Sequence, residues 1–191
     1  MTHFDVIIIG GGASGLMCAL TAGQRGRRVL VLDGANKIGK KILMSGGGRC
    51  NFTNLFVEPG NFISANPAFC ISALNRYTQW DFIALVEKHR IPYHERKHGQ
   101  LFCDDSAKDI LGMLVTECEQ AKVRIQTHCE IKAVAATGEA DAEKRFSVNT
   151  GKGDFTARSL VIATGGLSIP TMGASGIGYD IARQFGLQIG R

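Results

Sequence analysis

Long apolar runs are missing from this chain of 191 residues. No apolar stretch approaches the roughly 18 residues that a membrane-spanning helix needs, so we expect no membrane segment. The apolar start at Val6–Ile9 is short, has no basic leader and continues into glycines instead of a cleavage site. A signal peptide is therefore not expected. Together these absences predict a cytoplasmic protein.

Closely spaced cysteine pairs are missing as well. The sequence has six cysteines, and no two of them form a Cys-x-x-Cys pair. Their spacing therefore disfavours both a zinc site and a thioredoxin-like redox motif. Scattered cysteines in a chain without a signal peptide are expected to be buried thiols in a reducing compartment. We predict no metal site.

Charge is not concentrated in one long run, and the net charge of +5 would fit an anionic ligand or a nucleic acid. Glycine, in contrast, is abundant. The chain has 24 glycines, about twice the share of ~7% that proteins usually have. They cluster at residues 10–15, 46–48, 165–166 and 173–178. Clustered glycines indicate backbone that turns sharply or lies against a ligand.

The first third of the chain predicts a βαβ unit. Phe4–Ile9 is an apolar, β-branched run that ends in three glycines, which is typical of a buried parallel strand. Ala13–Arg25 has apolar residues at helical spacing, and Val29–Leu32 is a second buried strand. A strand, a glycine turn, a helix and a strand within about 30 residues form a βαβ unit with a right-handed crossover.

The remaining elements complete an α/β pattern. Residues 34–64 predict a long loop with one helical turn around Lys37–Leu43, and a loop of this length is usually functional. Helices are expected at Pro67–Tyr77, Gln79–His89, Ser106–Lys122 and Gly176–Phe185. Strands are expected within residues 91–105 and at Val123–Thr127, Glu130–Ala135, Phe146–Asn149, Phe155–Ala157 and Leu160–Ala163. We predict a Rossmann-like domain over residues 1–191, with a parallel sheet, helices on both faces and a small antiparallel β-meander as a crossover.

The glycines at Gly10–Gly15 match the dinucleotide pattern G-x-G-x-x-G. The match follows a strand, opens a helix and precedes an acid, Asp33, that lies 23 residues after Gly10 at the end of the next strand. In this pattern Gly10 permits the tight turn, Gly12 lets the pyrophosphate approach the backbone, and Gly15 lets the helix pack against the strand. The helix N-terminus presents free N–H groups to the phosphates.

Asp33 would accept hydrogen bonds from a ribose hydroxyl and repel a 2′-phosphate, which disfavours NADP. A glycine-rich turn without a ligand is the alternative, and the strand and acid around the motif argue against it. Ser14 is either a phosphate contact or a first-turn helix residue with its hydroxyl in water.

A second glycine cluster carries a family resemblance. Three consecutive glycines followed by Arg and Asn within Gly39–Asn54 suit a loop whose amides and guanidinium meet a flat, polar or anionic ligand. Together with Ala163–Gly166, this stretch resembles the bacterial NAD(P)/FAD-dependent oxidoreductases of the BaiN-like or aminoacetone-oxidase-like family. The family also has matching residues at Ser168, Pro170, Gly173, Gly176, Gly178 and Tyr179.

The resemblance implies which residues bind FAD. The ADP half would be held by Gly10, Gly12, Ala13, Ser14, Gly15 and Asp33, with Gly34 beside them. The ribityl and isoalloxazine region would be lined by Lys41, Ser45, Gly46, Gly47, Gly48, Arg49, Cys50 and Asn51. Ile131 would offer its backbone to the adenine, and Ala163, Thr164 and Gly165 would approach the cofactor from the end of a strand.

The chain departs from the resembled family in two ways. Many relatives have Arg and Pro where this chain has Gln100 and Cys103. Relatives are also about twice as long, so the resemblance implies that this chain stops before an inserted domain and before a C-terminal segment that completes the FAD site.

Other residues leave alternatives open. Cys50 is either a redox or covalently attached thiol beside the flavin or, as we favour, a packed thiol. A metal cluster and a solvated basic loop are the alternatives for His89, His94, Glu95, His98 and Cys103. Interleaved arginines and a lysine favour the basic loop. Tyr93 and Tyr179 are candidate acids, but no general acid or base is assigned.

We predict flavin-dependent redox chemistry on an unknown small molecule, with NAD(P)H as a candidate electron donor. One alternative is an NAD-binding dehydrogenase domain, which would not need the Ser45–Asn51 loop. The other is a non-catalytic basic module that binds nucleic acid, for which salt-dependent RNA binding is the test. Since the basic stretch lacks interleaved stacking aromatics, nucleic acid is not the expected partner.

Overall fold

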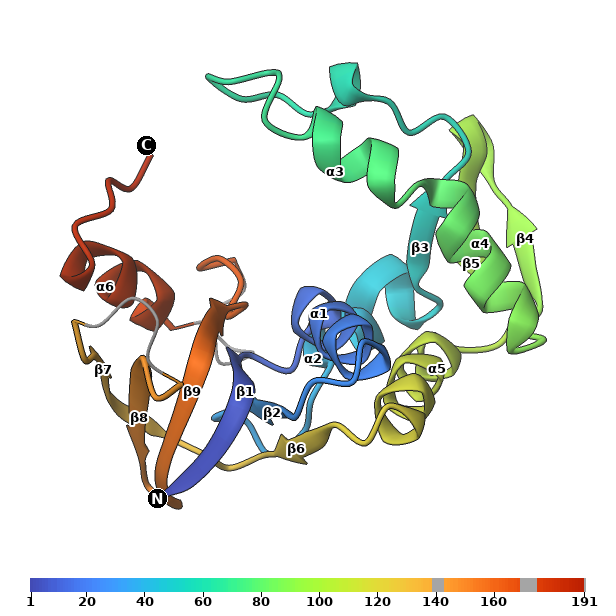
Figure 1. Cartoon of the computed structure of the whole chain (residues 1–191). Helices are drawn as coiled ribbons and strands as arrows, with labels where there is room; N and C mark the ends of the chain where they lie inside the picture. Colours follow the sequence, from blue (N-terminus) through green and yellow to red (C-terminus); the bar gives the residue numbers. More distant parts are fainter. Residues whose placement is uncertain (139–142, 169–174, 191) are drawn as a thin grey trace. The chain divides into compact units, whose positions relative to one another are not determined.

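The computed structural model describes residues 1–138, 143–168 and 175–190. The chain forms two compact units (Figure 1). The first unit comprises residues 1–41 and 114–191, and the second unit comprises residues 42–113. No helix in these described ranges is long and apolar enough to cross a membrane.

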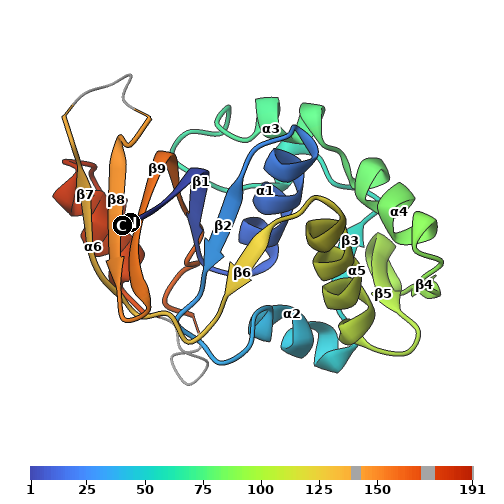
Figure 2. The ribbon, with the colours of Figure 1, turned by 60° about the horizontal axis from the view of Figure 1, so that its bottom comes forward.

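The first unit is built on a six-stranded sheet with the strand order β6-β2-β1-β9-β8-β7. Its strands are β1 (Thr2–Ile9), β2 (Val29–Leu32), β6 (Arg124–Gln126), β7 (Ile131–Ala136), β8 (Phe146–Thr150) and β9 (Gly153–Ile162). The first four in spatial order are parallel, and Figure 2 shows β6, β2 and β1 side by side. β7, β8 and β9 form the antiparallel meander that the sequence predicts.

Apolar side chains on both faces of the central strands hold this sheet between helices. All four residues of β2 are buried, as parallel strands require when helices cover both faces. Helix α1 (Ala13–Gln24) buries Leu16, Ala19 and Leu20. Helix α6 (Ile177–Gln184) inserts Ile181 into a separate core cluster built from alternate residues of β1 and β2 together with meander residues. The expected Rossmann-like α/β fold is confirmed.

The second unit contains a three-stranded antiparallel sheet with the order β3-β5-β4. Its elements are β3 (Asn51–Asn54), α3 (Ile71–Arg76), α4 (Gln79–Lys88), β4 (Tyr93–Glu95) and β5 (Gln100–Cys103). α2 (Lys40–Met44) and α5 (Ala107–Gln120) each cross the boundary between the units. α5 begins after Ser106, whose hydroxyl accepts a hydrogen bond from the Lys108 N–H, as expected of an N-terminal cap.

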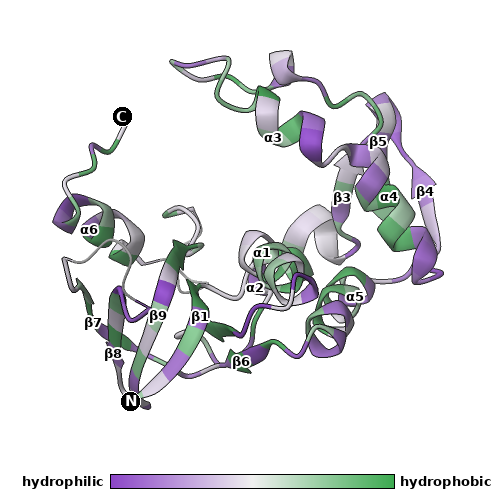
Figure 3. Cartoon of the chain, in the orientation of Figure 1, coloured by the Kyte–Doolittle hydropathy of each residue, from purple (hydrophilic) through white to green (hydrophobic). Residues whose placement is uncertain are grey.

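Two expectations about strands were wrong in detail. One continuous strand, β9, contains nearly all of the two strands expected at Phe155–Ala157 and Leu160–Ala163. Its pairing with β1 continues past the polar residues Arg158 and Ser159 that separate the two predicted strands. Figure 3 shows this hydrophilic interruption within β9. The long loop at residues 34–64 also contains β3, because that segment pairs with β5 far along the chain. Pro170 and Gly173 lie outside the described residues.

Candidate cofactor-binding site

The Gly10–Gly15 turn joins β1 to α1, as the dinucleotide pattern predicts. The Gly10 N–H donates to the carbonyl of Leu32 over 2.8 Å, which ties the turn to the end of β2. α1 starts with Gly12 as its N-cap, and no side chain in the described part of the chain caps the first turn. The first N–H groups of the helix therefore remain free for an anion, and the helix dipole favours negative charge there.

The three fingerprint glycines, Gly10, Gly12 and Gly15, lack a side chain for different physical reasons. Gly10 has a φ of 114°, and a Cβ there would collide with the carbonyl of Ala163. A Cβ on Gly15 would overlap the carbonyl of Gly10. Gly12 has an ordinary φ of −86°, and a Cβ there would meet no atom of the described residues within 4 Å. The fold itself thus needs Gly10 and Gly15, whereas the empty space at Gly12 fits a pyrophosphate approaching the helix.

Asp33, at the end of β2, braces the glycine turn. Its Oδ2 accepts a hydrogen bond from the Gly11 N–H over 2.7 Å, and its Oδ1 accepts one from the Ala35 N–H over 2.8 Å. An ionised carboxylate has about four acceptor positions, so both oxygens keep capacity for a ribose hydroxyl. Sequence reasoning assigned only the ribose contact to Asp33 and missed this brace. Gly34, which follows it, is exposed.

A third segment of the first unit follows the end of β9. The Ala163 N–H donates to the Ile9 carbonyl over 2.8 Å, and Gly165 adopts a φ of 72°. Lys41 donates from Nζ to the Gly166 carbonyl over 3.1 Å and to Ser168 Oγ over 3.0 Å. Lys41 and the Ala163–Gly166 segment, both predicted to bind FAD, are therefore in contact with each other.

The remaining first-unit predictions concern Ile131, Ala13, Ser14 and Thr164. Ile131 opens β7 and is half-buried against the core cluster, and its backbone contact with adenine stays a prediction. Ala13 and Ser14 are exposed in the first turn of α1. A Cβ on Gly178 would collide with Thr164 Oγ1, so the first turn of α6 packs against Thr164.

In the second unit, the Ser45–Gly48 turn needs its glycines for its own backbone. Gly46, Gly47 and Gly48 have φ values of 58°, 67° and 87°, which L-residues rarely adopt. A Cβ on Gly46 would also approach the Phe102 ring to 2.6 Å. The Ser45 hydroxyl donates to the Ile42 carbonyl over 2.8 Å, which closes the turn. Contact between this turn and the flavin ring remains a prediction.

Arg49, Cys50 and Asn51 continue from this turn into β3. Arg49 and Asn51 are exposed, whereas Cys50 is buried and has a φ of 50°. The pairing of β3 with β5 brings Cys103 close to Cys50. The Cys103 N–H donates to the Arg49 carbonyl over 3.0 Å, and Asn51 pairs with Phe102 in the sheet.

Both thiols are buried, and this sets their protonation. Burial raises the pKa of the Cys50 thiol, with a smaller opposing effect from a hydrogen bond with Ser45. Burial, and next the neighbouring Cys50, raise the pKa of Cys103 to about 12. A raised pKa keeps a thiol protonated and unreactive. The geometry therefore supports the packed-thiol interpretation of Cys50 over a nucleophilic one.

We expect Cys103 to resist alkylation in the folded protein. With a pKa of about 12, its thiolate fraction at pH 8 is roughly a thousandfold below that of an ordinary cysteine. Iodoacetamide should therefore label it far more slowly than in the urea-unfolded chain, and labelling should accelerate as the pH rises toward 12. Peptide mass spectrometry at timed intervals measures both rates. Equal rates in the folded and unfolded chains would contradict this assignment.

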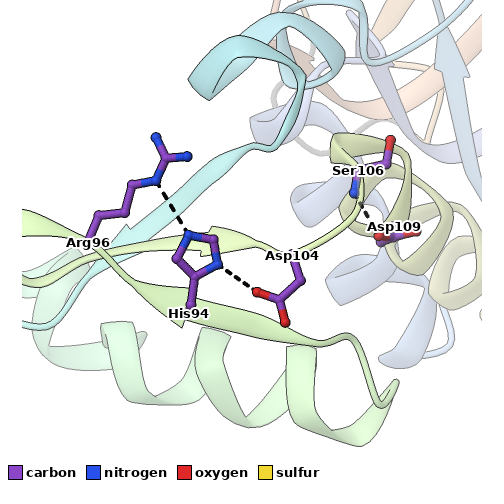
Figure 4. A network of polar contacts seen from close by, with 5 residues as sticks. All are labelled: His94, Arg96, Asp104, Ser106 and Asp109. Atoms are coloured by element: carbon purple, nitrogen blue, oxygen red, sulfur yellow. Dashed lines mark hydrogen bonds and ion pairs between the residues drawn. The ribbon is translucent and has the colours of Figure 1, made fainter.

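The histidine-rich stretch is held by local contacts. His94 Nδ1 lies 2.6 Å from Asp104 Oδ1, and the Arg96 Nε–H donates to His94 Nε2 over 3.4 Å (Figure 4). The Arg96 guanidinium also lies 4.3 Å from the centroid of the Phe102 ring. Both ring nitrogens of His94 are thus engaged. Within the described ranges, no group of three or more His, Cys, Asp or Glu side chains could hold a metal ion.

The two tyrosines named as candidate acids differ in their surroundings. Tyr93 donates its hydroxyl to Glu87 Oε1 over 2.9 Å, and this hydrogen bond raises the pKa of Tyr93. The hydroxyl of Tyr179 lies 3.4 Å from the position of a Cβ built on Gly166, so it adjoins the segment after β9. Tyr179 therefore adjoins a predicted cofactor segment.

The amino-acid sequence of this chain matches a known protein family and several curated proteins. Residues 4–191 match the HI0933-like protein Rossmann domain. The chain is 56% identical to a ribosomal RNA dihydrouridine synthase of Escherichia coli strain K12 over 99% of this chain and 46% of that protein. It is 29% identical to a 3-dehydro-bile acid delta(4,6)-reductase of Clostridium scindens over 94% of this chain and 43% of that protein. The chain thus spans just under half the length of these curated relatives.

Solved structures share the fold at low identity. Glycine oxidase from Geobacillus kaustophilus superposes with a TM-score of 0.61 and 16% identity, over 94% of this chain and 59% of that one. An open-conformation flavocytochrome c3 fumarate reductase reaches a TM-score of 0.64, also at 16% identity, over 96% of this chain and 40% of that one. The free α1 N-terminus, the open space at Gly12 and the position of Asp33 fit a dinucleotide. This chain belongs to the HI0933-like family and is an FAD-binding Rossmann domain.

Proposed function

We propose that this chain holds the FAD of an enzyme that reduces uridine to dihydrouridine in ribosomal RNA. The observation that carries the proposal is the 56% identity to the Escherichia coli ribosomal RNA dihydrouridine synthase. A second ribosomal RNA dihydrouridine synthase, from Haemophilus influenzae, is 48% identical over 98% of this chain and 46% of that protein. Acting on ribosomal RNA would also agree with the predicted cytoplasmic location.

The proposed reaction saturates the C5–C6 double bond of a uracil base, which requires a hydride and a proton. FAD supplies the hydride chemistry when it is bound, and NAD(P)H is the proposed source of electrons. The free N–H groups at the start of α1 would bind the pyrophosphate, and Asp33 would accept a ribose hydroxyl. These contacts orient the cofactor without taking part in proton transfer.

This proposal revises the expected substrate from a small molecule to RNA. A small-molecule substrate is still favoured by the likeness to the bile acid reductase, but at 29% identity this relative is much more distant. The net charge of +5 suits a polyanion. RNA is therefore the first candidate and a small unsaturated molecule the second.

The test is a reduction assay with the FAD-loaded holoenzyme. Ribosomal RNA transcribed without modifications is incubated with the enzyme and NAD(P)H, and nucleoside mass spectrometry detects dihydrouridine as uridine plus two hydrogens. We expect dihydrouridine at a discrete site, and none with a Gly12→Val variant that has lost its cofactor. Reduction of a steroid enone without any reduction of ribosomal RNA would instead support the second candidate.

A further inference from the structure

Five basic residues gather at one end of the sheet in the first unit, opposite the glycine turn. Three lie on the turn from α1 to β2, and two lie where α5 leads into β6. We call this group the basic edge: Arg25, Arg27, Arg28, Lys122 and Arg124. Every member is exposed.

The fold brings these two turns together. A Cβ on Gly23, near the end of α1, would lie 2.8 Å from the Ala121 carbonyl and 3.1 Å from Val123 Cγ2. The absent side chain therefore lets the α5–β6 turn pack directly against the end of α1. The parallel register of β2 and β6 pairs Leu30 with Arg124, which brings Lys122 level with Arg28. Residues almost a hundred positions apart thus share one surface.

Most of these cations have no partner among the residues that the structure describes. The side chains of Arg25, Arg27, Lys122 and Arg124 make no hydrogen bond or ion pair with any residue in the described ranges. Arg28 is anchored, because its guanidinium donates to the His3 carbonyl over 2.8 Å.

Three acids lie near this end of the sheet, and two of them are already engaged. Asp5 accepts a hydrogen bond from the Arg28 backbone N–H over 2.7 Å. The buried Glu117 accepts one from Gln24 over 3.1 Å. Glu119 is exposed on α5. Basic groups therefore outnumber acids at this end of the sheet, and most of the basic groups are free to bind anions.

The distribution of charge along the chain supports a role for this surface. Residues 42–113 carry seven Lys and Arg against seven Asp and Glu, so the whole net charge of +5 belongs to the sequence of the first unit. One third of the 15 basic residues of that unit lie in the basic edge. Uneven charge of this kind favours contact with a polyanion.

We propose that the basic edge binds the phosphate backbone of the RNA substrate, at a distance from the nucleotide that is reduced. This inference rests on the proposed function. The glycine turn lies at the carboxyl ends of β1 and β2, whereas the basic edge lies at the amino ends of β2 and β6. The rise per residue of a strand puts about 15–20 Å between these ends. The basic edge would therefore set RNA affinity without disturbing the pyrophosphate site at the glycine turn.

The test compares two triple variants of the holoenzyme with equal loss of charge. The first is Arg25→Gln, Arg27→Gln and Lys122→Gln. The control is Lys132→Gln, Lys144→Gln and Arg145→Gln, which removes three exposed cations from the β7–β8 hairpin region. Fluorescence anisotropy with unmodified ribosomal RNA transcript measures binding across a salt series. FAD content and thermal unfolding show that each variant is loaded and folded.

We expect the basic-edge variant to bind the transcript on the order of tenfold more weakly near physiological salt, and the slope of log affinity against log salt to fall by about two to three. KM for ribosomal RNA should rise with kcat unchanged, and the control should stay close to the parent. If the parent reduces ribosomal RNA and both triple variants weaken equally, or neither does, the basic edge is not the RNA surface and the proposed function stands. If the parent reduces no ribosomal RNA, the proposed function itself fails.

Discussion

Replacing Gly12 with valine should abolish FAD binding while the domain stays folded. The described residues leave the space beside Gly12 open, and the extended backbone of Gly12 at φ −86° and ψ −171° accepts a β-branched residue. The valine side chain would occupy the space through which the pyrophosphate reaches the α1 N-terminus. We expect FAD affinity to fall on the order of 100-fold or more, against a cost in folding of about 1 kcal/mol at an N-cap. Titration calorimetry with FAD and chemical denaturation measure the two effects.

Gly15→Val is the matched control, because here the fold and not the ligand excludes a side chain. A Cβ at this position would overlap the Gly10 carbonyl, so α1 and the glycine turn would have to separate. We expect a loss of stability of about 3 kcal/mol or more, with loss of FAD as a consequence. Unchanged FAD affinity in Gly12→Val, or unfolding of that variant to the same degree as Gly15→Val, would refute the distinction between the two glycines.

Replacing Asp33 with alanine should also cause a large loss of FAD. The substitution removes the acceptors of the Gly11 and Ala35 N–H groups, which the carboxylate now binds at 2.7 and 2.8 Å. Each N–H left without a partner costs about 1–3 kcal/mol if it stays shielded from water, and the ribose loses its acceptor as well. We therefore expect FAD affinity to fall on the order of 100-fold, together with a lower denaturation midpoint.

The Asp33→Asn variant separates the effect of the hydrogen bonds to the glycine turn from the effect of the negative charge. The asparagine carbonyl can still accept the hydrogen bond from Gly11, but its NH2 group cannot accept the one from Ala35, so only part of the stability should return. The negative charge that repels a 2′-phosphate is lost, and discrimination against NADP should weaken. Calorimetry with FAD, NAD and NADP on the parent and both variants measures this. If the parent binds NADP more tightly than FAD, Asp33 does not select the cofactor.

The local part of the cofactor site could be predicted from sequence because its spacing is set by backbone geometry. The fingerprint, the strand before it and the acid after it all lie within Phe4–Asp33, where each element is a neighbour of the next along the chain. The glycine of closest approach, Gly12, follows from the same pattern. The structure shows why each glycine is needed. Gly10 and Gly15 are required by the packing of the fold, whereas at Gly12 the described residues leave room for a side chain.

Contacts between distant segments could not be predicted in this way. The hydrogen bonds of Lys41 with Gly166 and Ser168 join residues about 125 positions apart, and no periodicity encodes such a pair. The neighbourhood of Cys50 and Cys103 depends on the pairing of β3 with β5, and β3 itself was expected to be loop. A four-residue strand carries too little pattern of its own to be recognised before its partner is known.

The sequence by itself determined the βαβ unit, the dinucleotide-binding turn and the set of glycines, because short-range sterics and the free N–H groups of a helix start depend on neighbouring residues only. Tertiary structure alone decided that Asp33 braces the glycine turn and that the Cys50 and Cys103 thiols stay protonated. It alone also decided that Arg25, Arg27 and Lys122 share one surface. Each of these depends on a strand register or a helix contact that joins remote segments, and burial and charge act through that contact.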